Sequence, residues 1–250
     1  MKSILFQIGP FTAYGYGLMI AVGVLAAFWI SMYRAKLAGL DDDALFTMGI
    51  IGVIGGLLGA KLMYWIVELP EIIKDPSILL QFNEGFVVYG GLILGFLSPY
   101  VYARIKKYPF WKYLDITVAG VAIAQGFGRM GCFLAGCCYG KETECALGVV
   151  FPEGSLAPAG VKLIPVQLIS SMGNFLIAVI LIAAGRKLKR PGMVSGLYLV
   201  LYSIGRFAVE FLRNDPRGSV GILSTSQFIA VFTMAVGLAV MAACLRKKER

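Results

Sequence analysis

Residues 14–33 read YGYGLMIAVGVLAAFWISMY, and no charged side chain interrupts this stretch. About 20 helical residues cross the roughly 30 Å hydrocarbon core of a bilayer, so the stretch is long enough for one transmembrane helix. It is too long for the apolar part of a signal peptide, and Arg34 and Lys36 follow it instead of preceding it. We therefore expect a membrane helix that stays in the mature protein.

Six further apolar segments follow along the 250-residue chain. They cover residues 44–67, 86–103, 113–136, 164–184, 193–212 and 226–245. The chain is 58% hydrophobic and only 15% charged, which is more apolar than a soluble domain of this length can bury. The sequence therefore predicts an all-α, polytopic membrane protein with about seven transmembrane helices, organised as a single integral membrane domain over residues 1–250.

The formal net charge of +9 comes from basic residues that lie mainly between the apolar segments. This distribution suits anionic lipid headgroups rather than one basic patch, so we expect membrane lipid and no nucleic acid as a partner. Of the 23 Lys and Arg residues, 14 flank one side of the predicted membrane, 6 flank the other and 3 fall within or near the ends of segments. Because the richer side faces the cytoplasm, the N-terminus is predicted outside and the C-terminus inside.

The chain has no histidine, which excludes Ser-His-Asp catalysis, histidine-ligated haem and most zinc or copper sites. Four of its five cysteines follow the spacing C-x4-C-C-x6-C: Cys132, Cys137, Cys138 and Cys145. This is not the C-x2-C spacing of common zinc or iron–sulfur sites, so we expect no metal and no cofactor. The interpretation as small apolar residues is favoured, and disulfides at the outer face remain the alternative.

Charged side chains inside a span are costly and need a partner or a function. Residues 125–140, QGFGRMGCFLAGCCYG, contain five glycines, which suit a backbone that turns or approaches a ligand. Within them, Arg129 offers a planar donor fork for phosphate or carboxylate. Lys61, in the second span, either extends toward the interface or pairs with an anion, and a substrate phosphate is the more specific hypothesis.

A second charged stretch, residues 201–213, reads LYSIGRFAVEFLR. Tyr202, Arg206 and Glu210 recur every four residues, so they share one helical face. This spacing favours an ion pair between Arg206 and Glu210. A paired guanidinium still has donors left for an anionic ligand.

The predicted depths of these residues coincide. Arg206 lies roughly 20 Å along its helix at 1.5 Å per residue, and Arg129 lies at a similar depth. Tyr16 and Tyr89 begin the first and third spans from the outside. Interfacial tyrosines alone are ordinary membrane anchors, but their coincidence with two arginines favours a site for an anionic lipid headgroup in the outer leaflet.

Two further patterns predict structure rather than function. The spacings of Gly55 to Gly59 and of Gly91 to Gly95 are typical of helices that pack closely in membranes. Asp115, at the cytoplasmic end of the fourth span, is expected to interact with a helix dipole.

Taken together, these segments resemble the prolipoprotein diacylglyceryl transferase family nearly from end to end. The matching motifs are Tyr16-Gly17-Leu18-Met19, Gly90-Gly91-Leu92-Ile93, Gly128-Arg129-Met130-Gly131-Cys132-Phe133 through Gly140, Pro165-Val166-Gln167-Leu168, Gly192-Met193-Val194-Ser195-Gly196-Leu197 and Tyr202 to Arg213. The glycine–arginine signature together with the Y-x3-R-x3-E-F-x-R block is the specific part.

This resemblance implies transfer of a diacylglyceryl group from phosphatidylglycerol to the lipobox cysteine of a preprolipoprotein signal peptide, in the bacterial cytoplasmic membrane and without a metal. Arg129 and Arg206 match the arginines that are thought to hold the lipid phosphate. Other matches to the site or its support are Tyr16, Tyr202, Glu210, Gln167 and Gly140.

The chain departs from well-studied members at three positions. It has Tyr89 where they have histidine, and Cys132 and Cys137 where they have asparagine and an acidic residue. A tyrosine accepts a proton only if its pKa falls from about 10. Three alternatives therefore stay open: a lipid-binding paralogue without catalysis, a small-molecule transporter, and a thiol–disulfide carrier built on the cysteines.

Overall fold

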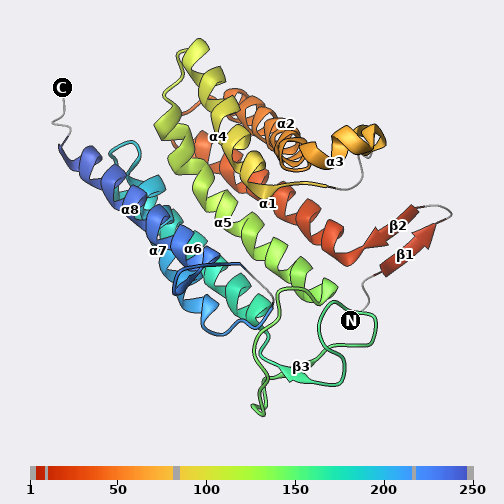
Figure 1. Ribbon diagram of the computed structural model, residues 1–250. Helices are drawn as coiled ribbons and strands as arrows, with labels where there is room; N and C mark the ends of the chain where they lie inside the picture. Colours follow the sequence, from red (N-terminus) through yellow and green to blue (C-terminus); the bar gives the residue numbers. More distant parts are fainter. Residues whose placement is uncertain (1–3, 9–10, 81–84, 216–217, 247–250) are drawn as a thin grey trace. The chain divides into compact units, whose positions relative to one another are not determined.

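The computed structural model describes the whole chain except residues 1–3, 9–10, 81–84, 216–217 and 247–250. Each of the seven predicted segments corresponds to one long helix (Figure 1). These helices are α1 (Gly15–Leu37), α2 (Asp42–Val67), α4 (Val88–Ile105), α5 (Phe110–Ala135), α6 (Val166–Lys187), α7 (Met193–Glu210) and α8 (Thr225–Arg246). Five basic residues from the charge comparison lie outside the described residues: Lys2, Arg217, Lys247, Lys248 and Arg250.

The short elements were not predicted from the sequence. They are α3 (Leu69–Lys74), the 3-10 helix η1 (Pro76–Leu80), and, in the described part of the chain, the strands β1 (Ile4–Ile8), β2 (Phe11–Tyr14), β3 (Val149–Val150), β4 (Lys162–Leu163), β5 (Ser219–Val220) and β6 (Leu223–Ser224). The strands pair as three two-stranded sheets, β1 with β2, β3 with β4 and β5 with β6, all antiparallel. Elements this short contain too few residues to show a clear hydrophobic period.

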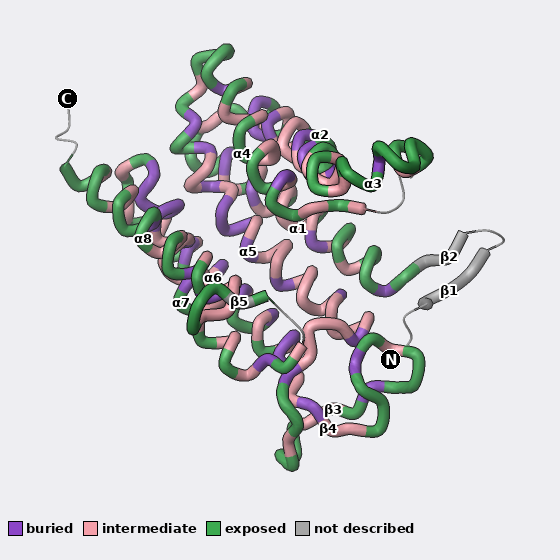
Figure 2. The backbone as a smooth tube through the Cα atoms, viewed as in Figure 1, coloured by how far each residue is buried: buried purple, intermediate pink, exposed green. Residues whose placement is uncertain are grey.

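Among the described residues, six helices are long and apolar enough to cross a bilayer: α1, α2, α5, α6, α7 and α8. Helix α4 is not among them; its 18 residues include Pro99 and Arg104. Long stretches of these helices are exposed (Figure 2). Many of the exposed residues are large and apolar, and Trp29 of α1 is 72% exposed. Exposed apolar surface on this scale requires lipid, so the protein is a multi-pass membrane protein, and the seventh span stays a prediction.

The structure divides into two compact units, residues 35–113 and residues 1–34 with 114–250. In the first of these, α2 and α4 pack closely at glycines. A Cβ atom added to Gly59 would collide with the carbonyl oxygen of Gly90, and one added to Gly90 would collide with that of Gly59. A Cβ on Gly55 would lie 3.0 Å from the carbonyl oxygen of Leu94. The predicted packing role of the small residues is confirmed.

The other unit, 1–34 with 114–250, contains α5, α6, α7 and α8. Asp115 of α5 caps the N-terminus of α7, since its Oδ2 accepts from the amide of Gly192 at 2.7 Å and its Oδ1 from the amide of Ser195 at 2.7 Å. The hydroxyl of Ser195 also donates to Oδ1, at 2.6 Å. The structural role of Asp115 is confirmed, although the helix that it caps is α7 and not its own. This cap fixes α7 against α5.

Candidate functional site

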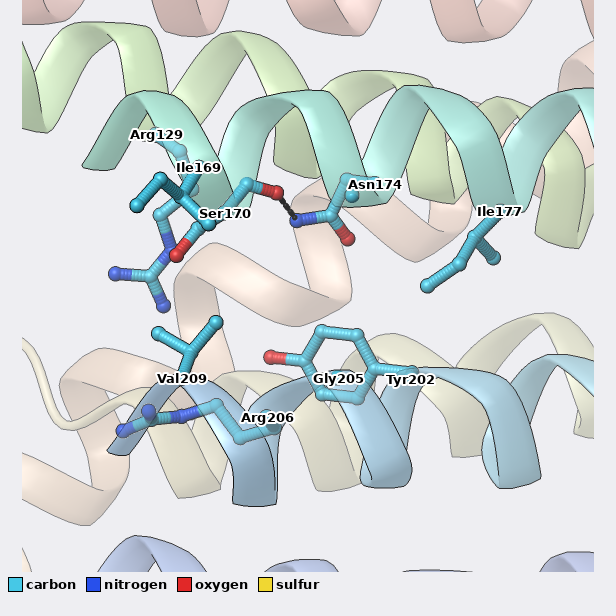
Figure 3. A pocket seen from close by; sticks show the side chains of 10 residues that line it. Arg129, Ile169, Ser170, Asn174, Ile177, Tyr202, Gly205, Arg206 and Val209 are labelled. Carbon is cyan, nitrogen blue, oxygen red and sulfur yellow. Dashed lines mark hydrogen bonds between the residues drawn. The ribbon is translucent and has the colours of Figure 1, made fainter. Parts of the chain in front are cut away.

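A pocket in the unit 1–34 with 114–250 lies among α5, α6 and α7 (Figure 3). It is lined by Arg129, Ile169, Ser170, Gly173, Asn174, Ile177, Tyr202, Gly205, Arg206 and Val209. Its atom-free space is about 420 Å³ including its open mouth. Figure 3 shows the guanidinium groups of Arg129 and Arg206 at the same end, with the Tyr202 hydroxyl turned toward them. The structure thus brings together three residues that the sequence selected.

Arg206 is held by two neighbours. Its Nη1 donates to Glu210 Oε2 at 2.6 Å, which confirms the ion pair predicted from their spacing. Its Nη2 donates to the Ser226 hydroxyl of α8 at 2.5 Å. Both side chains of the ion pair are largely buried, with exposed fractions of 14% for Arg206 and 7% for Glu210. A guanidinium has five N–H donors, so Arg206 keeps donors for a ligand.

Arg129 extends from α5 and interacts with the Tyr202 hydroxyl of α7. The Tyr202 ring stacks on the Tyr198 ring with centroids 5.8 Å apart. The Tyr198 hydroxyl donates to Gln125 Oε1 of α5 at 2.9 Å. These contacts hold α5 and α7 together beside the pocket. Because the charged side chains among the described residues that line it are those of Arg129 and Arg206, the pocket is suited to an anion.

Gln167 and Gly140, two residues that the resemblance assigned to the site or its support, do not line the pocket. Gln167 is buried, and its Nε2 donates to the carbonyl oxygen of Cys137 at 2.8 Å. Gly140 pairs with Arg213 in an isolated bridge, and an added Cβ would lie 2.5 Å from Val166 Cγ2. Only glycine fits there, so both residues shape the loop after α5.

Three of the four clustered cysteines converge in that loop. The Sγ atoms of Cys132, Cys137 and Cys138 all lie within 4.8 Å of one another, which the sequence spacing did not predict. All five cysteines lie in the described part of the chain, and none forms a disulfide. Hydrogen bonds with the thiols of Cys132 and Cys137 lower the pKa of the Cys138 thiol below its ordinary value, and Arg213 and Arg129 act in the same direction.

Tyr16, in the first turn of α1, lies beside this cluster. An added Cβ on Gly131 of α5 would come within 3.0 Å of the Tyr16 ring. The Tyr16 hydroxyl is also within electrostatic range of Arg129 and of the three thiols. Tyr16 therefore lies near Arg129, as predicted, although it is not one of the residues that line the pocket.

Lys61 and Tyr89 belong to the unit 35–113. Lys61 is buried, with its Nζ over the rings of Tyr64, Trp65 and Phe86 at 4.9, 5.9 and 5.4 Å from their centroids. These cation–π contacts were not predicted. Tyr89 lies in the first turn of α4 and is 51% exposed. Contributions of Lys61 and Tyr89 to the site stay predictions.

Sequence reasoning missed the polar residues that α6 contributes. Ser170 and Asn174 line the pocket four residues apart, and Asn174 Nδ2 donates to the Ser170 carbonyl oxygen at 2.8 Å (Figure 3). The Oδ1 atom of Asn174 is buried and has no partner among the described residues. The signal was present, because an asparagine inside a predicted span is costly unless it finds a partner.

Known proteins similar to this chain identify its family. The prolipoprotein diacylglyceryl transferase family matches residues 3–243. A phosphatidylglycerol–prolipoprotein diacylglyceryl transferase of Clostridium tetani is 49% identical over 238 residues, which cover 95% of this chain and 96% of that relative. One from Symbiobacterium thermophilum is 31% identical over 247 residues, covering 96% of this chain and 92% of that relative. This chain belongs to the prolipoprotein diacylglyceryl transferase family.

Proposed function

We propose that this protein is a transferase that moves a diacylglyceryl group from phosphatidylglycerol to a cysteine thiol of a prolipoprotein. The observation that carries the proposal is the position of two guanidiniums, of Arg129 and Arg206, at one end of one pocket. Glu210 neutralises one of the two positive charges. The remaining net charge of +1 matches the single negative charge of the phosphodiester in phosphatidylglycerol.

The reaction adds negative charge to the phosphate, and this is where the arginines act. The cysteine thiolate attacks the glyceryl carbon that bears the phosphate oxygen, so that a C–S bond forms as the C–O bond breaks. The electron pair of the C–O bond stays on the phosphate, glycerol phosphate leaves, and the thiol proton passes to water. Since the leaving phosphate gains a second negative charge, Arg129 and Arg206 bind it more strongly in the transition state than in the substrate.

The other site residues have supporting roles in this proposal. The hydroxyls of Tyr202 and Tyr16 orient the headgroup beside the arginines. Tyr89 contributes a hydrogen bond from the start of α4, in the place of the histidine of other members. Gln167 and Gly140 hold the loop that carries the cysteines.

The topology is part of the proposal. We infer one integral membrane domain over residues 1–250 with seven spans, in which α4 is the seventh. The charge distribution supports an N-terminus outside and a C-terminus in the cytoplasm of a bacterial cell. The acceptor is then the lipobox cysteine of a signal peptide at the outer side of the cytoplasmic membrane. Lys61 provides a further contact to the lipid phosphate.

Complementation tests the function directly. The chain is expressed in bacteria depleted of their own transferase, and the expected result is growth with thioether-linked diacylglycerol on a lipobox peptide. Arg129→Ala and Arg206→Ala should insert in the membrane and fail to rescue, whereas the exposed Arg186→Ala serves as a matched control. If the wild-type protein inserts and binds phosphatidylglycerol but does not restore growth, the result would instead favour a lipid-binding paralogue without catalysis. This is the alternative suggested by Tyr89 in the place of histidine.

A further inference from the structure

The three converging thiols form a site that the arginine pocket does not use. Cys132 lies in the last turn of α5, and Cys137 and Cys138 follow in the loop. Their Sγ atoms lie within 4.8 Å of one another, and all three residues are partly buried. Cys145, the fourth member of the sequence cluster, is exposed and does not belong to the group.

The backbone holds this arrangement at a conformational cost. Two backbone hydrogen bonds end helix α5: the amide of Gly136 donates to the carbonyl oxygen of Phe133 at 3.2 Å, and the amide of Cys137 donates to that of Cys132 at 3.1 Å. The chain then reverses through left-handed conformations at Gly136, with φ of 71°, and at Cys138, with φ of 60°. A residue other than glycine persists in this region only where its surroundings impose it. The loop is therefore preorganised with its thiols together.

Three thiolates at this separation suit a tetrahedral zinc ion. With Zn–S bonds of about 2.3 Å, tetrahedral geometry places sulfurs about 3.8 Å apart, which a small contraction of the cluster provides. Three protein ligands with an open fourth position are the arrangement of catalytic zinc sites. The spacing C-x4-C-C predicted no metal site, because a spacing alone does not reveal that the chain turns back at Gly136 and Cys138 and brings the thiols together.

Charge and location link the cluster to the pocket. Zinc with three thiolates has a net charge of −1, and Arg129 lies within electrostatic range of Cys132 and Cys138. Arg213 lies within the same range of Cys138. Arg129 also lines the pocket, so one charged residue is shared between the cysteine cluster and the proposed phosphate site.

We infer that Cys132, Cys137 and Cys138 bind a zinc ion whose fourth position takes the thiolate of the acceptor cysteine, an inference that rests on the proposed function. Water leaves zinc as the acceptor thiol binds, and the thiol proton passes to bulk water. The bound thiolate then forms the C–S bond as the glyceryl C–O bond breaks, and glycerol phosphate leaves with the electron pair. The thioether product is a weak ligand, so water replaces it. A thiol that binds zinc loses its proton without the help of a protein base. Zinc would therefore activate the acceptor thiol in a chain that has no histidine to act as that base.

Metal content and cobalt spectroscopy test this inference with the full chain purified in detergent. The expected result is one zinc ion per chain in wild type and in the matched control Cys145→Ser, and about tenfold less in Cys137→Ser and Cys138→Ser. In the cobalt-substituted protein, a lipobox peptide should shift the visible bands as a fourth sulfur binds, and the same peptide with serine for cysteine should not. Thermal unfolding of each variant distinguishes metal loss from loss of the fold.

Three outcomes would overturn the inference: full transfer by protein that contains no zinc, copper in place of zinc, or a disulfide among the three cysteines in active protein. Arg129→Ala separates this inference from the proposed function, because it should lose transfer and keep zinc. Zinc binding with the peptide-induced shift but no transfer by wild type would refute the proposed function and leave the metal site standing.

Discussion

Replacing Arg206 by lysine tests the role of its donor fork. The guanidinium binds Glu210 at 2.6 Å and Ser226 at 2.5 Å and still presents donors to the pocket. A lysine ammonium is a point charge and cannot hold these partners and a phosphate in the same geometry. If the lysine of Arg206→Lys keeps the ion pair with Glu210, the site loses one charge-assisted hydrogen bond to the phosphate. Such a bond contributes about 1.5–3 kcal/mol. At 1.36 kcal/mol per factor of ten, transfer should fall about 10- to 150-fold.

The assay is single-turnover transfer from labelled phosphatidylglycerol to a lipobox peptide in detergent, with Arg186→Lys as the matched control. Thermal unfolding should change little for Arg206→Lys, because the buried carboxylate of Glu210 keeps a positive partner. Arg206→Ala removes the cationic partner of that buried carboxylate and should be less stable by about 3–5 kcal/mol. Transfer by Arg206→Lys at the wild-type rate would refute the reasoning.

Three further predictions address the fold and the site. Asp115→Ala removes the cap of α7 and should lower the unfolding free energy by about 1–2 kcal/mol in a denaturant titration in micelles, and an unchanged midpoint would contradict the capping role. Gly59→Val should destabilise the α2–α4 packing by about 1–3 kcal/mol in the same titration, whereas Gly17→Ala, with open space around its Cβ, should not. Tyr89→Phe removes the hydrogen bond proposed for the Tyr89 hydroxyl and should slow transfer about 2- to 10-fold, and complete loss would instead make that hydroxyl essential.

The long helices follow from local sequence, and this is why they could be predicted. Continuous apolar runs of about 20 residues have few alternatives to a helix in lipid. The ion pair between Arg206 and Glu210 follows likewise from a four-residue spacing within one helix. The hairpins β3–β4 and β5–β6, with strands of two residues, have no such periodicity.

The arrangement of the site depends on contacts between distant segments, which the sequence does not contain in readable form. Arg129 and Arg206 line one pocket on α5 and α7, two helices that Asp115 joins across 80 positions of sequence. The resemblance to the family nevertheless identified both arginines. The convergence of the cysteines depends on a left-handed residue, Cys138, that no propensity would place there.

The central claim is that Arg129 and Arg206 together bind the phosphate of phosphatidylglycerol. A measurement of lipid binding tests this claim most directly. Native mass spectrometry of the purified protein with equal amounts of phosphatidylglycerol and the zwitterionic phosphatidylcholine reports the preference without requiring catalysis. Wild type and Arg186→Gln should retain phosphatidylglycerol selectively, and Arg129→Gln and Arg206→Gln should each lose about 10- to 100-fold of that selectivity. An unchanged preference in the double variant Arg129→Gln/Arg206→Gln would contradict it.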